Sequence, residues 1–246
     1  MPRPDHPQSY YDDIKGKFKQ ARDVRLDYRP PGTEQFTSEF SGELAKYAVD
    51  PYAKAVEQRE PITDKVEVLF IGGGFSALLT SARLREHGLE SIRIVERGSD
   101  VGGTWYWNRY PGAACDVVSY DYLPLLDELD YVPVDHYSRG PEIFGHCQKI
   151  AKKYNLYELA VFNTTVTETI WNEEEQLWHV KTDCGDVMRA QFVICANGTL
   201  AKPKLSTIKG MTSFAGHSFH TSRWDYDYTG VDLENLKDKV VGIIGT

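Results

Sequence analysis

Three positions early in the chain have the types and spacing of a phosphate-binding turn. Gly72, Gly74 and Ala77 follow an apolar run and fit the pattern G-x-G-x-x-G/A. Glycine lets the backbone turn tightly and approach a pyrophosphate, and a small third residue lets the following helix pack on its strand. A glycine pattern alone would equally fit a plain turn. Glu96, however, ends the next apolar run, where a carboxylate can accept hydrogen bonds from an adenosine ribose, so the set predicts dinucleotide binding.

The segment that follows is dense in glycine and aromatic residues. Paired glycines suit a second close approach of backbone to phosphate, and a run of aromatic rings suits the walls around an isoalloxazine. An aromatic loop packed into a protein core is the alternative interpretation. The candidate residues are Gly102, Gly103, Thr104, Trp105, Tyr106 and Trp107.

The elements that must position these residues follow from apolar patterning. Residues 66–71 and 91–95 predict strands and residues 75–87 a helix, which together make a strand–helix–strand unit of about thirty residues. A further helix is expected over 140–154. Strands are expected over 164–171, 176–182 and 187–195, the first two forming a hairpin, while residues 98–126 are expected to be a long functional loop.

Each end of the chain carries a segment outside that unit. Residues 1–63 are polar and interrupted by prolines, with helices expected over 9–28 and 41–59, the second capped by Ser41 or Ser38. This extension is either a structural wrap or a contributor to substrate or partner binding. Residues 239–246 predict a second nucleotide-binding strand entering a glycine turn, because Val240–Gly245 echoes the first fingerprint strand.

Composition limits the class of protein. The 246 residues correspond to roughly one and a half domains, and the net charge of −8 disfavours a general nucleic-acid or anionic-membrane binder. No export or membrane segment is expected. The four cysteines show no metal-ligand or redox-pair spacing, so we expect reduced thiols and a cytoplasmic location.

Several blocks together resemble one family, the type I Baeyer–Villiger monooxygenases, over residues 65–246. They are the fingerprint with Glu96, the block 102–122, the segment 193–198 with Pro203, and residues 214–225. The last block fits the family signature F-x-G-x-x-x-H-x-x-x-W-P/D at every specified position: Phe214, Gly216, His220, Trp224 and Asp225.

The resemblance implies a Rossmann-like, doubly wound α/β FAD-binding domain with a small β-rich portion, plus the start of a second Rossmann-like NADPH domain. The expected boundaries are an extension over 1–63, the FAD domain over 64–212, a signature linker over 213–238 and the NADPH-domain strand over 239–246. The implied activity inserts one oxygen of O2 beside a ketone carbonyl, giving an ester or lactone through a C4a-peroxyflavin, with NADPH as reductant. The resemblance also implies that FAD is the tightly bound flavin.

The resemblance also implies roles for single residues. Flavin contacts are expected from the glycines, Ala77, Glu96, residues 104–107, Asp116, Tyr122 and the backbone of Val166, and NADP contacts from Ala114, Cys115 and Asp116. Asp116 is expected to orient a catalytic arginine that lies beyond Thr246, with a loop-capping carboxylate as the alternative. His220 and Trp224 are assigned to coupling of the two cofactor domains.

Two departures from the family and three rival classes remain open. Ala114 stands where the family often has arginine, and Asn197 where Thr or Ser is usual. The chain alone is expected to be an incomplete enzyme, because most of the substrate pocket would lie downstream. The rivals are a flavin N- or S-monooxygenase, a flavin disulfide reductase, which would need a CxxxxC pair that is absent here, and a non-catalytic FAD-binding fragment.

Overall fold

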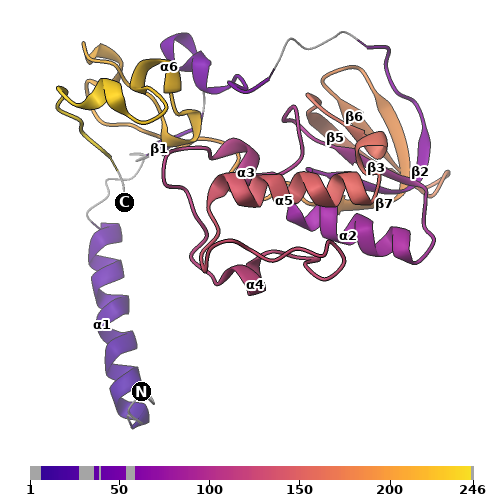
Figure 1. Cartoon of the computed structure of the whole chain (residues 1–246), viewed down its shortest axis with the longest axis horizontal. Coiled ribbons are helices and arrows are strands. Elements are labelled where there is room, and N and C mark those ends of the chain that lie inside the picture. The colour runs from indigo at the N-terminus through magenta and orange to yellow at the C-terminus, as the bar shows by residue number, and fades with distance from the viewer. Residues whose placement is uncertain (1–6, 28–35, 39, 54–58, 245–246) are drawn as a thin grey trace.

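The computed structural model describes residues 7–27, 36–38, 40–53 and 59–244 (Figure 1). Its helices are α1 (Gln8–Asp27), α2 (Phe75–Glu86), α3 (Thr104–Trp107), α4 (Ser119–Tyr122), α5 (Gly140–Lys153) and α6 (Tyr226–Thr229). Short 3-10 turns are η1 (Gly42–Tyr47), η2 (Tyr157–Leu159), η3 (Met211–Ser213), η4 (Thr221–Arg223) and η5 (Glu234–Leu236). The strands are β1 (Phe36–Thr37), β2 (Lys65–Ile71), β3 (Ile92–Val95), β4 (Ala160–Val161), β5 (Val166–Asn172), β6 (Leu177–Thr182), β7 (Val187–Cys195) and β8 (Leu205–Ser206).

A six-stranded mixed sheet forms the body, in the order β4-β3-β2-β7-β6-β5. The pairs β4–β3, β3–β2 and β2–β7 are parallel, whereas β7–β6 and β6–β5 are antiparallel. The carboxyl ends of β2, β3 and β7 therefore meet at one edge, where parallel sheets place ligands. This arrangement confirms the predicted α/β class.

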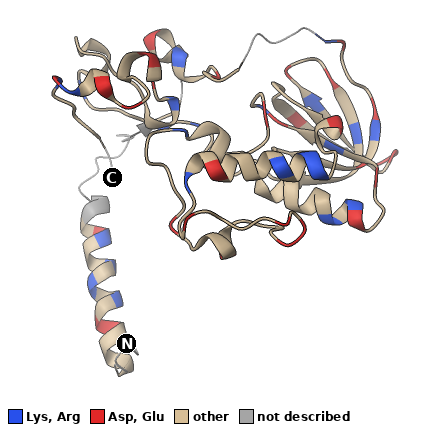
Figure 2. Ribbon diagram, in the orientation of Figure 1, with Lys and Arg blue, Asp and Glu red and all other residues tan. Residues whose placement is uncertain are grey.

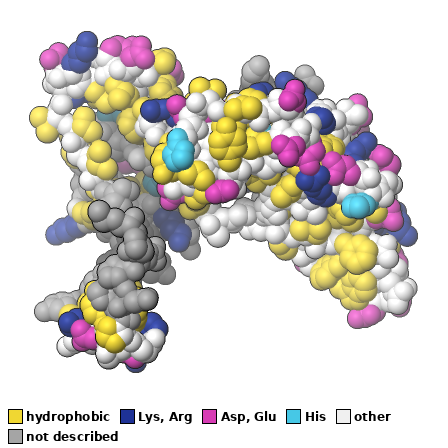
Figure 3. Space-filling view, turned by 60° about the horizontal axis from the view of Figure 1, so that its bottom comes forward, with side chains coloured by type: hydrophobic (Ala, Val, Ile, Leu, Met, Phe, Trp, Pro, Cys, Tyr) yellow, Lys and Arg dark blue, Asp and Glu magenta, His cyan; other side chains and the backbone are white. Residues whose placement is uncertain are grey.

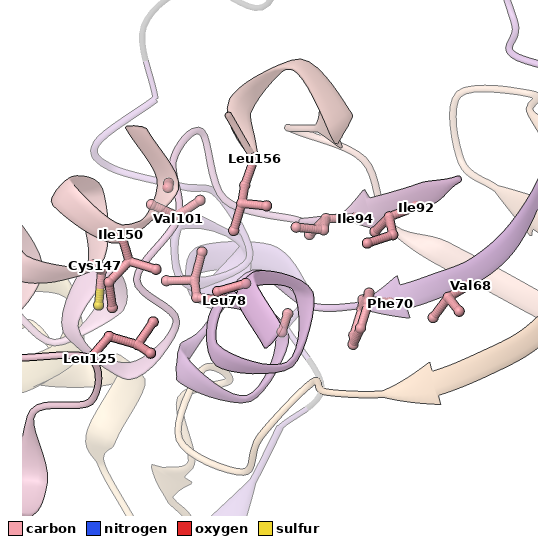
Figure 4. Close-up of a cluster of buried hydrophobic side chains, with 13 residues drawn as sticks. Val68, Phe70, Leu78, Ile92, Ile94, Val101, Leu125, Cys147, Ile150 and Leu156 are labelled. Atoms are coloured by element: carbon pink, nitrogen blue, oxygen red, sulfur yellow. The ribbon is translucent and has the colours of Figure 1, made fainter. Parts of the chain in front are cut away.

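One face of the sheet carries the main core. Phe70 of β2 and Ile94 of β3 are fully buried against Leu78 of α2 and Ile150 of α5 (Figure 4). The apolar positions of α2 recur at helical spacing, which directs one stripe of side chains onto the strands. The packing fixes the start of α2 over the end of β2.

The opposite face has a smaller core. Leu69, Met188 and Val180 are fully buried there, on β2, β7 and β6. The predicted hairpin forms from β5 and β6 and turns at residues 173–176, and most of β5 is exposed. The two antiparallel strands thus extend the parallel sheet beyond β7.

The extension is held to the body at several points. Strand β1 pairs antiparallel with β8, and the Lys46 ammonium donates to the backbone oxygen of Ser218 at 3.1 Å. Figure 1 shows this part of the extension beside α6. Farther along, the Arg59 guanidinium forms two hydrogen bonds with the Asp186 carboxylate, at 2.6 and 2.7 Å. In its described parts from residue 36 onward, which are residues 36–38, 40–53 and 59–62, the extension therefore contacts the body, as a structural wrap would.

The second predicted helix, over 41–59, is much shorter than expected. Only η1 forms, with Ser41 at its N-cap, and residues 54–58 of the prediction lie outside the described residues. Asp50 Oδ1 accepts a hydrogen bond from the backbone N–H of Tyr52 at 2.9 Å, a local turn across Pro51 that competes with helix. The expected loop over 98–126 contains the one-turn helices α3 and α4.

The strand predicted over 239–246 is not formed in its described part. Residues 239–244 have no regular structure, and the side chains of Val240, Val241, Ile243 and Ile244 are exposed. A strand pairs its backbone groups with a neighbour, and no described strand lies beside this segment. Gly245 lies outside the described residues, so the second nucleotide-binding strand remains a prediction.

The surface of the molecule is mixed in character. Basic and acidic residues are interspersed along the ribbon in Figure 2, and hydrophobic side chains form separate groups between charged ones in Figure 3. None of the described helices has the length and apolar character to cross a membrane.

Candidate dinucleotide-binding site

A cavity of about 860 Å³ lies where the parallel strands end. The last residues of β2, β3 and β7, which are Ile71, Val95 and Cys195, all line it. Its volume falls in the range of small-molecule and cofactor sites. The other walls come from the start of α2, the turn leading into α3, residues 164–169 and residues 196–202.

Glycine backbone forms the floor of the cavity. Gly72 has a φ of 105°, and a Cβ there would lie 2.6 Å from the backbone oxygen of Ala196. Gly74 caps α2, and a Cβ on the facing Gly103 would lie 2.9 Å from the Gly74 Cα. Side chains at these positions would fill the space, whereas glycine leaves the N-terminal amides of α2 open to an anion. A cradle of this kind fits a pyrophosphate.

Glu96 stands beside the cradle and is 5% exposed. Its two carboxylate oxygens accept hydrogen bonds of 2.6 Å from the backbone N–H groups of Gly73 and Gly98. Burial raises the pKa of this carboxyl, and the two backbone donors act in the opposite direction. Each oxygen has a further lone pair, so Glu96 can still accept from the hydroxyls of a ribose.

Helix α3 brings two predicted aromatic residues to the cavity. Trp105 and Trp107 both line it, together with Tyr122, whose hydroxyl accepts a hydrogen bond of 2.9 Å from Trp105 Nε1. Burial raises the pKa of Tyr122, and the nearby charge of Asp116 adds to that effect. These side chains provide a largely apolar wall that would keep water from a bound ring.

The structure places Tyr106 and Ala77 behind the cavity lining. Tyr106 is 1% exposed and does not line the cavity, because its hydroxyl donates to Asp50 Oδ2 at 2.5 Å on the far side of α3. Ala77 is fully buried in the core beneath α2, as the helix-packing role of its fingerprint position requires. Both residues hold the walls of the cavity from behind.

Two arginines flank Trp107. The guanidinium carbons of Arg97 and Arg223 lie 4.5 and 4.6 Å from its ring centroid. Arg97 lines the cavity and donates to the backbone oxygen of Ala201 at 3.0 Å. Arg223 is 7% exposed, and burial followed by repulsion from Arg97 lowers its pKa. This rim of the cavity is therefore positively charged.

Asp116 lies on an exposed loop outside the cavity lining. Its carboxylate has no hydrogen bond or ion pair with a described residue, so the loop-capping alternative finds no support. The neighbouring Ala114 is exposed and bridges to Arg139, and Cys115 is buried, with its thiol donating to the backbone oxygen of Val117. The carboxylate is thus available to a partner outside the described structure.

The signature residues fold the linker around α6. Trp224 Nε1 donates to Thr229 Oγ1 at 3.0 Å, and Asp225 caps α6 by accepting from the Tyr228 N–H at 3.0 Å. His217 contacts the other oxygen of Asp225 at 2.9 Å.

The first half of the signature is more open. Phe214 is 65% exposed, and its ring lies over Gly216, where a Cβ would be 2.5 Å from the ring and would displace this exposed side chain. His220 accepts a hydrogen bond from the Ser222 N–H at 3.1 Å, and burial lowers its pKa. None of the five signature residues lines the cavity.

Sequence reasoning missed several wall residues. Arg97, directly after Glu96, and Lys202 supply positive charge, and Thr165 and Thr167 flank the predicted Val166. The position of Arg97 next to the acidic end of β3 was the available signal. Lys202, Thr165 and Thr167 had no such signal, because they lie near strands whose positions in the sheet cannot be read from the local sequence.

Comparison with known proteins bears on this site. Residues 71–126 match the family model of the NAD(P)-binding Rossmann-like domain. The chain is 52% identical over 238 residues to pentalenolactone D synthase of Streptomyces arenae and 46% identical over 237 residues to a Baeyer–Villiger monooxygenase of Streptomyces coelicolor. By sequence and by fold, the chain is similar to part of the Baeyer–Villiger monooxygenases, and the matches to both relatives cover 95% of this chain.

Solved structures of ketone-oxidising monooxygenases show the same similarity. The polycyclic ketone monooxygenase of Thermothelomyces thermophila superposes with a TM-score of 0.84 at 35% identity, covering 96% of this chain and 41% of that one. A crystal structure of OTEMO with FAD and NADP gives a TM-score of 0.61 at 33% identity, covering 65% of this chain and 30% of that one. The chain spans about two fifths of the length of the curated relatives, 39% in each of the two named above.

Proposed function

We propose that this chain binds FAD in the cavity at the ends of β2, β3 and β7. The observation that carries the proposal is the glycine cradle beside Glu96, in which Cβ atoms at Gly72 and Gly103 would collide with backbone. Gly74 and the amides at the start of α2 would hold the pyrophosphate, and Glu96 the adenosine ribose. The 860 Å³ volume is adequate for an extended dinucleotide.

We further propose that the whole protein is an FAD- and NADPH-dependent monooxygenase that converts a ketone into an ester or lactone with O2. When bound, FAD would take hydride from NADPH and pass electrons to O2. Trp105, Trp107 and Tyr122 would exclude water from that reaction. Asp116 would orient a cationic side chain from outside this chain through a charge-assisted hydrogen bond, with Ala114 and Cys115 near NADP.

The signature linker would couple the two cofactor-binding parts. His220 and Trp224 lie in a segment that leads from the FAD-binding body toward residues 239–246. Trp224 is hydrogen-bonded within this segment, and His220 is hydrogen-bonded both within it, to Ser222, and to the backbone of Lys204 in the body. This supports a mechanical role for them rather than contact with the ketone. The four free cysteines, which form no disulfide, fit a cytoplasmic location.

Polycyclic ketones are the proposed substrate class. The polycyclic ketone monooxygenase matches 96% of the chain, including the extension, whereas the OTEMO structure matches 65%. The described residues of the extension line no part of the cavity, so they would influence ketone choice only through the walls that they support.

Purified full-length protein tests the proposal directly. We expect a yellow preparation that releases one FAD on denaturation, and lactone or ester products from polycyclic and cyclic ketones with NADPH and O2. A colourless, flavin-free protein that gains no flavin on incubation with FAD would overturn the cofactor assignment. Oxidation confined to amines or sulfides would overturn the reaction and favour an N- or S-monooxygenase.

A further inference from the structure

The N-terminal extension reaches the back of the aromatic turn through Asp50. The Tyr106 hydroxyl donates to Asp50 Oδ2 at 2.5 Å and accepts from the Ser99 N–H at 3.1 Å and from the Ser99 hydroxyl at 2.6 Å. Tyr106 is 1% exposed, and burial together with the Asp50 hydrogen bond raises its pKa to about 12. The hydroxyl therefore remains a donor at neutral pH, which suits a carboxylate acceptor.

Arg109 joins a third segment to this contact. Its guanidinium carbon lies 4.1 Å from the ring centroid of Tyr52, in the extension, and 4.6 Å from that of Tyr106. Arg109 Nε donates to the Tyr106 backbone oxygen at 2.8 Å, and the Tyr226 hydroxyl donates to the Arg109 backbone oxygen at 2.5 Å. The extension, the turn after α3 and helix α6 thus meet at one place.

The contact lies directly behind a wall of the cavity. Helix α3 has only four residues, and a single helical turn has little stability of its own. Trp105 and Trp107, the neighbours of Tyr106 in sequence, both line the cavity. The direction of their rings therefore depends on how the backbone of α3 is held, and the Tyr106–Asp50 hydrogen bond holds it from the opposite side.

We propose that Asp50 is a positioning residue for the cofactor cavity, and that docking of the extension segment 50–52 and binding of FAD stabilise each other. Asp50 holds Tyr106, and through it α3, so that the two tryptophans stand in the wall. Coupling between two binding events is reciprocal, so FAD must strengthen the docking by the factor that the docking strengthens FAD binding. The inference rests on the proposed FAD site.

A set of matched variants of the full-length protein tests this coupling. Asp50→Ala removes the hydrogen bond to Tyr106, Tyr106→Phe removes it together with the two hydrogen bonds to Ser99, and Asp50→Asn keeps an acceptor oxygen. The control is Tyr131→Phe, which also removes a hydroxyl that donates to a carboxylate, Glu142 Oε1 at 2.7 Å, but away from the cavity lining. Tyr131 is less buried than Tyr106, and its hydroxyl has the Glu142 carboxylate as its partner, so this control reports the loss of one tyrosine–carboxylate hydrogen bond away from the cavity.

Two measurements on each variant separate positioning from general stability. Titration of the apoprotein with FAD, followed by flavin fluorescence, gives the dissociation constant, and urea unfolding gives the stability. We expect Tyr106→Phe and Asp50→Ala to weaken FAD binding about tenfold, Asp50→Asn to recover most of that loss, and Tyr131→Phe to stay within twofold of wild type. FAD should also slow tryptic cleavage after Lys46 in wild type and lose that effect in Asp50→Ala.

The outcomes distinguish this inference from the proposed function. If wild type binds no FAD, the proposed cofactor site fails and the coupling fails with it. If wild type binds FAD but Tyr106→Phe and Tyr131→Phe change its affinity equally, or neither changes it, the positioning role of Asp50 is overturned while the FAD site stands.

Discussion

Replacement of Asp186 by asparagine should destabilise the protein in a manner that depends on pH. The Asp186 carboxylate is fully buried, and it accepts hydrogen bonds from Arg59, from the Ile62 N–H at 2.7 Å and from Thr182 Oγ1 at 2.5 Å. Burial alone would raise the pKa of this carboxyl. The donors, Arg59 foremost, outweigh burial and lower the pKa from 3.8 to about 2.

The size of the effect follows from that pKa. A tenfold change in proton affinity corresponds to about 1.4 kcal/mol, so the bound carboxylate contributes about 2 kcal/mol to the free energy of unfolding. The folded-state pKa lies below the unfolded one, so this stability is present above pH of about 4 and is lost as the pH falls toward 2. Between pH 5 and pH 3 the contribution should shrink by about 1 kcal/mol.

Urea unfolding of wild type and Asp186→Asn at pH 7, 5 and 3, followed by circular dichroism, measures the difference. We expect Asp186→Asn to be less stable by about 2 kcal/mol at pH 7 and pH 5, with the gap narrower at pH 3. Arg59→Ala should show the same pH trend, because a protonated Asp186 no longer needs the cation. If the substitution lowered the free energy of unfolding equally at pH 7 and pH 3, the stabilisation could not be assigned to the ionised pair.

Two further substitutions address the site. Gly74→Ala should weaken FAD binding more than tenfold while changing the free energy of unfolding by less than about 1 kcal/mol, because its new Cβ meets Gly103 at a tolerable 3.4 Å but fills the cradle. Flavin titration and urea unfolding check this, with Gly72→Ala as the contrasting case that should lose several kcal/mol through its collision with Ala196. Asp116→Ala should keep FAD bound and lose most ketone oxygenation in the full-length protein; an unchanged turnover number would contradict the role given to Asp116.

The strand–helix–strand unit was predictable because local sequence alone encodes it. The apolar run before Gly72, the helical spacing after Gly74 and the acidic end of β3 all act within thirty residues. Strand β7 was placed at its observed bounds for the same reason.

What sequence could not predict depends on contacts between distant segments. Nothing local shows that the Tyr106 side chain turns away from the cavity, because its partner Asp50 is 56 positions away. The helix expected to continue past Tyr47 ends because Pro51 and the Asp50 turn intervene, and periodicity outweighed those breakers in the prediction. Residues 239–244 have a strand-like sequence but are exposed and irregular, because a strand forms only where a neighbouring strand pairs with its backbone.

The close approach of Gly74 and Gly103 has a consequence for engineering of this scaffold. The two glycines belong to separate turns, and a Cβ on Gly103 would lie 2.9 Å from the Gly74 Cα, whereas a Cβ on Gly74 would fit against Gly103 but enter the cradle. Gly74 has no side-chain atoms to give up, so a substitution at Gly103 cannot be compensated by a smaller residue at Gly74. Mutational libraries should therefore leave this pair fixed and place diversity on the open rim, where the flexible side chain of Lys202 can be exchanged without moving a backbone.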